Sequence, residues 1–91
     1  MKKEIFETIA SAIPHLIGGK GYVAIEEKNG EIVTYWQFNK PKTYYIDCRK
    51  WREAYLDDDY LELAFREWIL DNEKEILEGI QNEEGIQNEN K

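Results

Sequence analysis

Apolar residues in the first part of the chain recur at the spacing of an amphipathic helix. Between residues 3 and 13 they lie three or four positions apart, with charged and hydroxyl side chains between them. Pro14 has no amide hydrogen to donate, so we expect it to end or kink this helix. The glycine-rich run 18–21 follows a helix and precedes a strand, which is the reverse of a phosphate-binding P-loop, and we interpret it as a connector.

The pattern then changes to the alternation that is typical of strands. Residues 22–28 and 31–38 alternate on either side of Asn29-Gly30, the strongest short signal for a hairpin with a type I′ turn. This turn pairs Val23 with Trp36 and defines the register of the hairpin. The predicted core face consists of Val23, Ile25, Ile32, Trp36 and Phe38.

A third strand is expected over residues 43–49, with Ile46 and Cys48 on the core face beside Tyr44. The short connection from the hairpin favours a three-stranded antiparallel meander in the order 1-2-3. The opposite face then carries Tyr22, Tyr35 and Tyr45. Tyrosines on a sheet face stack nucleic-acid bases or anchor proteins, but they are also ordinary strand residues.

Residues 50–80 have helical spacing, first around Trp51 and then along a stripe from Leu61 to Leu77. The run Asp57-Asp58-Asp59 is expected at the start of the second helix, with Asp59 and Glu62 as a capping box. Caps at Asp71-Asn72 would divide it, so residues 58–79 are predicted as one helix or two. Gly79 is expected to end the helix.

The predicted fold is therefore α+β: an N-terminal helix, the three-stranded meander, and one or two acidic C-terminal helices. Residues 1–80 are expected to form a single globular domain. The hexapeptide EGIQNE occurs at 78–83 and again at 84–89. Its glycines and amides lack the apolar periodicity of a core, so residues 81–91 are predicted to be a disordered tail.

Charge divides the chain into two unlike parts. Residues 1–52 hold nine Lys and Arg against six acidic residues, whereas residues 53–91 hold three against thirteen, and the whole chain carries −7. This asymmetry bears on partners rather than on the fold. The apolar runs are too short for a membrane span or a signal sequence, so we expect a cytoplasmic protein without membrane contact.

Residues for catalysis or metal binding are few. His15 is the only histidine, Cys48 is the only cysteine and is expected in the core, and Ser11 is the only serine. Glu26 and Lys28 resemble a fragment of a metal-dependent nuclease site but lack its upstream acid. We therefore expect no enzyme, no cofactor and no metal.

The acidic helices are the predicted partner-binding surface. On a continuous helix, Glu67, Asp71 and Glu75 lie on one line, and such like charges repel at a cost of about 0.2–0.5 kcal/mol per pair. A field of carboxylates can imitate a phosphate backbone and steer a basic protein surface toward it. The candidate residues are Asp57, Asp58, Asp59, Glu62, Glu67, Asp71, Glu75 and Glu78.

In size, charge and element order the chain resembles the small acidic inhibitors of phages and mobile elements, anti-CRISPR proteins among them. The resemblance lies in the segments YVAIEEKNGEIVTYWQF, TYYIDC and YLDDDYLELAFREWILDNEKEILEG, without a diagnostic motif. It implies an inhibitor that presents an acidic surface to a basic, nucleic-acid-binding effector, without binding nucleic acid directly.

Two other functions are consistent with the sequence. An immunity protein or antitoxin uses similar carboxylate-rich surfaces to neutralise a toxin. A protein- or RNA-binding module would instead use Tyr22, Tyr35 and Tyr45. The sequence does not decide between a monomer and a homodimer.

Overall fold

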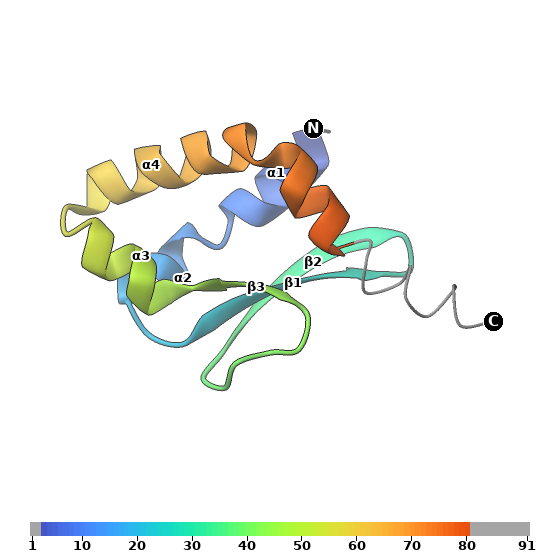
Figure 1. Cartoon of the computed structure of the whole chain (residues 1–91), viewed down its shortest axis with the longest axis horizontal. Helices are drawn as coiled ribbons and strands as arrows, with labels where there is room; N and C mark the ends of the chain where they lie inside the picture. Colours follow the sequence, from blue (N-terminus) through green and yellow to red (C-terminus); the bar gives the residue numbers. More distant parts are fainter. Residues whose placement is uncertain (1–2, 81–91) are drawn as a thin grey trace.

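This computed structural model describes residues 3–80 of the chain. They form a sheet of three antiparallel strands and helices that cover one face of the sheet (Figure 1). The elements in order are α1 (Lys3–Ala10), α2 (Ile13–Gly18), β1 (Tyr22–Lys28), β2 (Glu31–Gln37), β3 (Tyr44–Asp47), α3 (Cys48–Ala54) and α4 (Asp58–Asp71). Residues 73–80 are again helical. The predicted α+β class, with an N-terminal helix, an antiparallel sheet and C-terminal helices, is confirmed.

The hairpin has the predicted register. Asn29 and Gly30 have φ angles of 52° and 81°, as a type I′ turn requires. Val23 pairs with Trp36 across β1 and β2. Local turn chemistry therefore determined this part of the sheet.

The strand order is β2-β1-β3, so the predicted meander, with β2 in the centre, is wrong. The central strand is the one with consecutive apolar residues, Val23-Ala24-Ile25, and all of them are buried. These residues pair with a strand on each side, whereas β2 has one neighbour and no buried residue. Residues 38–43 connect β2 to β3, which lies on the other side of β1.

Two further expectations about the sheet are corrected. Phe38 lies beyond the end of β2 and is 68% exposed, with its ring against Trp36 rather than in the core. The third strand ends at Asp47, and Cys48 begins α3 instead of continuing the strand. The Asp47 side chain causes this early end, because it accepts the amide hydrogen of Arg49 as an N-cap.

The N-terminal helix is shorter than expected. It ends at Ala10, and Pro14 lies in the first turn of α2, so it helps to begin a helix rather than to end one. Its missing amide hydrogen costs nothing there, because first-turn amides have no partner within the helix. Gly19, with φ 69°, caps the end of α2.

The C-terminal helices differ from the prediction at both ends. Asp57 is the N-cap of α4, and its carboxylate accepts the amide hydrogen of Tyr60 at 3.0 Å, so the expected box of Asp59 and Glu62 is not formed. Gly79 does not end the last helix, since residues 73–80 are helical through it. The absence of a side chain there makes room for the Tyr44 ring. The tail predicted at residues 81–91 lies outside the described residues.

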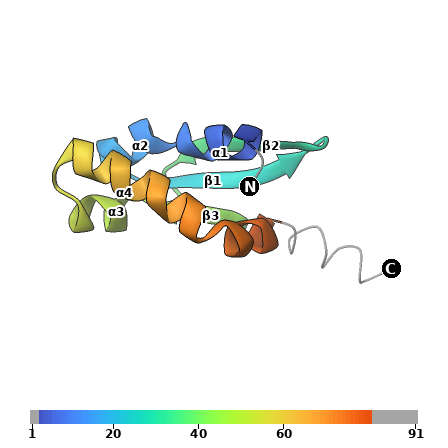
Figure 2. The same cartoon turned by 90° about the horizontal axis from the view of Figure 1, so that it is seen from above.

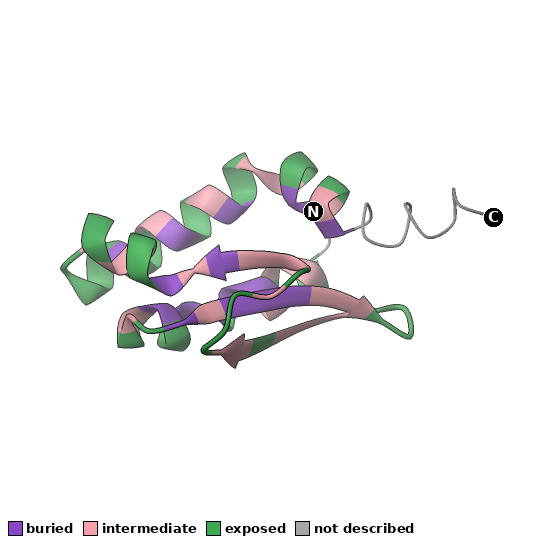
Figure 3. Cartoon of the chain, turned by 60° about the horizontal axis from the view of Figure 1, so that its bottom comes forward, coloured by how far each residue is buried: buried purple, intermediate pink, exposed green. Residues whose placement is uncertain are grey.

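The core lies between the sheet and the helical layer. Seen from above, α1 and α2 lie toward the side of the sheet that holds β2, and α4 crosses the molecule obliquely toward the side that holds β3 (Figure 2). Buried positions gather on β1, on β3 and on the inner sides of the helices (Figure 3). The largest buried side chains include Phe65, Leu61 and Ile69 from α4, with Ile76 from residues 73–80. The opposite face of the sheet carries no helix in the described part of the chain.

Candidate functional site

All of the predicted acidic site residues are exposed, but they do not form one uniform field. Asp57 is used as the N-cap of α4. Asp58 forms an ion pair with Arg52 of α3, and Glu62 forms one with Arg66 at 3.4 Å. Within residues 3–80, no hydrogen bond or ion pair engages the remaining side chains, which are Asp59, Glu67, Asp71, Glu75 and Glu78.

The expected line of Glu67, Asp71 and Glu75 is interrupted. Asn72 caps α4, donating its backbone N–H and its Nδ2 to the carbonyl of Trp68, both at 3.0 Å. Residues 58–79 are thus two helices. Glu67 and Asp71 remain one turn apart on α4, while Glu75 belongs to the next helix and lies near Tyr44, whose pKa is raised by burial and by the charge of Glu75.

The outer face of α4 also carries large apolar residues, which lie outside the predicted buried stripe. Tyr60, Leu63 and Leu70 are 61%, 55% and 58% exposed, and Leu56 is exposed just before the helix. Their spacing of three, four and seven residues would have revealed a second helical stripe, opposite the buried one. Exposed apolar patches with polar rims are typical of interaction surfaces.

A groove of about 410 Å³ runs beside this stripe. Tyr55, Tyr60, Leu63 and Trp68 line its apolar part, and Glu67 and Asp71 contribute carboxylates; Ala64 and Asn72 complete the lining. We call this feature the α4 groove. The rings are held by a cluster that extends into the core, because Trp51 packs on Tyr55, Phe65 and Trp68 with centroids 5.3–5.5 Å apart.

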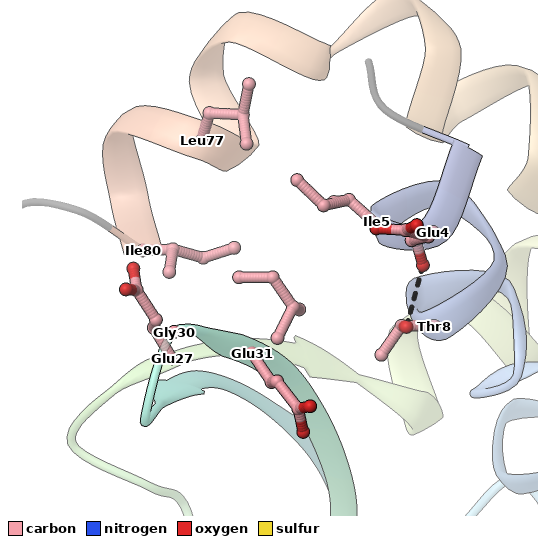
Figure 4. A pocket seen from close by; sticks show the side chains of 9 residues that line it. Glu4, Ile5, Thr8, Glu27, Gly30, Glu31, Leu77 and Ile80 are labelled. Carbon is pink, nitrogen blue, oxygen red and sulfur yellow. Dashed lines mark hydrogen bonds between the residues drawn. The ribbon is translucent and has the colours of Figure 1, made fainter.

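A second cavity, of about 420 Å³, lies between α1, the hairpin and the last helix (Figure 4). Ile5, Ile32, Leu77 and Ile80 form its apolar wall. Glu27 lies across from Ile32 in the hairpin register, and Figure 4 shows its carboxylate directed toward Ile80. The cavity is therefore acidic and apolar, as the α4 groove is.

The predicted tyrosine surface exists on the open face of the sheet. Tyr35 and Tyr45 pair with Ala24 from opposite sides, which explains why this small residue is fully buried on an uncovered face. Tyr22 meets Tyr45 edge to face, with centroids 5.4 Å apart. The central position of β1 thus brings together the three tyrosines that the sequence suggested.

Two lysines lie over these rings. Lys28 Nζ is 5.2 Å from the centroid of Tyr35, and Lys40 Nζ is 5.3 Å from that of Tyr45. Tyr35 also donates its hydroxyl to Glu26 at 2.6 Å, and this bond lowers the pKa of Glu26 and raises the pKa of Tyr35. The open face therefore combines aromatic rings with two cations and the Glu26 carboxylate, whereas the lining of the α4 groove combines rings with carboxylates alone.

The residues considered for chemistry are placed apart from one another. His15 is exposed and stacks on Trp36 at 6.4 Å. Cys48 is fully buried, as predicted, and its pKa is raised to about 11 by burial and then by the charge of Asp47. Among residues 3–80, no group of three or more His, Cys, Asp or Glu side chains is arranged to hold a metal ion.

Searches against protein-family models, curated proteins and solved structures found no match to this chain. None of the helices within residues 3–80 has the length and apolar character needed to cross a membrane.

Proposed function

We propose that this chain is a non-enzymatic, cytoplasmic binding protein that presents the acidic side of its helical layer to a basic protein surface. The observation that supports this most directly is the set of carboxylates on α4 and residues 73–80 that form no hydrogen bond or ion pair within residues 3–80: Asp59, Glu67, Asp71, Glu75 and Glu78. Unpaired like charges on one side of a molecule raise its potential and attract a cationic partner.

The partner is a nucleic-acid-binding protein whose cleft is built for phosphate, such as a CRISPR effector nuclease. The acidic surface occupies that cleft and excludes the nucleic acid, so the chain acts as an inhibitor. Direct binding of nucleic acid through this side is disfavoured, because carboxylates and phosphates repel each other. A toxin with a basic active site has the same chemistry, and binding to such a toxin would make the chain an immunity protein or antitoxin.

A pull-down with the full chain from a host lysate, scored for a nuclease effector and for a toxin, identifies the partner. The purified pair is then compared at rising salt. We expect the affinity to fall steeply, since exposed charges are screened over roughly 8–10 Å near physiological ionic strength. The double variant Glu67→Lys/Asp71→Lys should lose binding, mainly through a slower association rate.

The matched control is Glu4→Lys/Glu31→Lys, which changes the net charge by the same amount at the cavity between α1 and the hairpin, outside the α4 groove. It should retain most of the affinity. Equal losses in both variants would show that only net charge matters, and unchanged binding in both would refute the proposal.

The open sheet face supports a second candidate function, because Lys28 and Lys40 lie over the tyrosine rings there. Stacking rings beside cations are the components of a single-strand RNA platform or of a protein-anchoring surface. Replacing Tyr22, Tyr35 and Tyr45 with Ala tests it, with circular dichroism as the folding control. Loss of partner binding in this variant, with Glu67→Lys/Asp71→Lys unaffected, would move the site to the sheet face.

A further inference from the structure

The wall of the α4 groove is aromatic, and part of it packs against the core. Tyr55 and Tyr60 lie with their ring centroids 5.7 Å apart, and Trp68 stacks on the buried Phe65 at 5.9 Å. Because Tyr55 and Trp68 pack against the core, a ligand does not have to order these two rings first. Such rings present faces to which a cation is attracted, most favourably a planar guanidinium.

The rim of the groove carries two carboxylates and no cation within the described residues. Glu67 and Asp71 are one helical turn apart, and their repulsion costs roughly 0.2–0.5 kcal/mol in the free protein. One guanidinium placed between them removes this repulsion and can donate hydrogen bonds to both. A lysine ammonium supplies the charge but not the planar fork.

The apolar stripe continues the groove along α4. Leu63 and Leu70 are two helical turns apart and more than half exposed, with Glu67 between them. Exposed leucines contribute nothing to an electrostatic imitation of phosphate. The apolar face of a partner helix, in contrast, would cover them. The pattern of aromatic wall, carboxylate rim and flanking leucines thus specifies both the apolar and the charged parts of a ligand.

The charge of the surface selects among possible occupants. A second copy of this chain would bring another acidic α4 to the interface, and each chain carries a net charge of −7. A nucleic acid or an anionic membrane is repelled for the same reason. We infer that the α4 groove binds an arginine-bearing amphipathic helix of the partner protein, with the arginine between Glu67 and Asp71 and apolar side chains on Leu63 and Leu70. This inference rests on the proposed function and specifies its partner.

A synthetic helix-forming peptide provides the test. Its binding face repeats Leu and Arg at helical spacing, and the controls are the same peptide with Lys for Arg and a scrambled peptide of identical composition. Calorimetry with the full chain at physiological salt should show binding of the arginine peptide, several-fold weaker binding of the lysine peptide and none of the scrambled one. Two-dimensional NMR should place the shifted resonances on α4.

Two protein variants separate apolar from charged contributions. Leu63→Ser/Leu70→Ser should weaken the affinity for the arginine peptide by about tenfold or more, because the apolar area that both leucines bury against the ligand is lost. Glu67→Gln/Asp71→Asn should weaken it to a similar degree and abolish the preference for arginine over lysine. Phe38→Ser, which removes an apolar side chain that is more exposed than either leucine from the loop after β2, is the control and should bind as the wild type does.

Equal binding of the scrambled peptide, or an unchanged affinity in Leu63→Ser/Leu70→Ser, would overturn the inference. If either of these results were found and Glu67→Lys/Asp71→Lys nevertheless abolished binding of the basic partner, the proposed function would be supported and only the inference of an arginine-bearing helix would be wrong. Sedimentation of the free chain gives a further check, because a dimer that Leu63→Ser/Leu70→Ser dissociates would show that the occupant is a second copy.

Discussion

Gly79 allows two opposing effects to be weighed in a single substitution, Gly79→Ala. In a helix, alanine is more favourable than glycine by about 0.5–1 kcal/mol. A Cβ at position 79 would, however, lie 2.8 Å from Cε2 of Tyr44 and closer still to Cδ2. Carbon atoms normally approach to about 3.5–4.0 Å, so the ring or the helix must move.

The movement is costly because Tyr44 packs against the core and the atoms in the way belong to its rigid ring. Overpacking of this kind costs about 1–3 kcal/mol. We therefore expect Gly79→Ala to lower the free energy of unfolding by about 1–2 kcal/mol. In a domain of this size, each kcal/mol of lost stability lowers Tm by about 4–8 °C. Thermal and urea unfolding followed by circular dichroism measure it.

Two controls separate the clash from helix propensity. Gly18 ends α2, and a Cβ there meets nothing within 4 Å, so Gly18→Ala should be neutral or stabilising. In a Tyr44→Leu background the ring is absent, and Gly79→Ala should then stabilise the protein. A rise in Tm for Gly79→Ala in the wild type would refute the contact between the last helix and Tyr44.

The other predictions concern the caps, the thiol and the tail. Asp57→Ala should cost about 0.5–2 kcal/mol in urea unfolding because α4 loses its N-cap, whereas Asp59→Ala should cost much less. The folded-state pKa of Cys48 is raised from 9.0 to about 11, so its contribution to stability is complete below pH 9 and is lost as the pH rises through 11. Cys48→Ala should make the alkaline loss of stability shallower, and a thiol reagent should modify Cys48 only at the rate of unfolding. Deletion of residues 81–91 should leave Tm nearly unchanged, and a loss of several degrees would contradict this.

Local signals in the sequence predicted local structure well. Asn29-Gly30 determines its own turn and hence the register of Val23 with Trp36, since both depend on neighbouring residues. The strand order depends on which strand is flanked on both sides, and the buried Ala24 shows that β1 is that strand. An isolated alanine in a strand pattern gives little sign of this, because its burial comes from tyrosines on two other strands.

The candidate site was predicted in part for a similar reason. Charged side chains on a helix are almost always exposed, so the apolar periodicity of α4 was enough to place its acidic residues on the surface. Leu63 was overlooked because the buried stripe of Leu61 and Phe65 already accounted for the helix. The α4 groove depends on Tyr55, which precedes α4 in the chain and joins it through packing on Trp51 and on Tyr60.

The contact of Gly79 with Tyr44 also determines how the fold tolerates a change in the number of EGIQNE units. Ile80 is buried, so the first three residues of the first EGIQNE unit, at 78–80, belong to the folded domain. Loss of either unit by replication slippage places Glu, Gly and Ile at the same three positions, and gain of a unit does so too. The gene can therefore change its number of repeats while the protein keeps the same glycine against the same tyrosine ring.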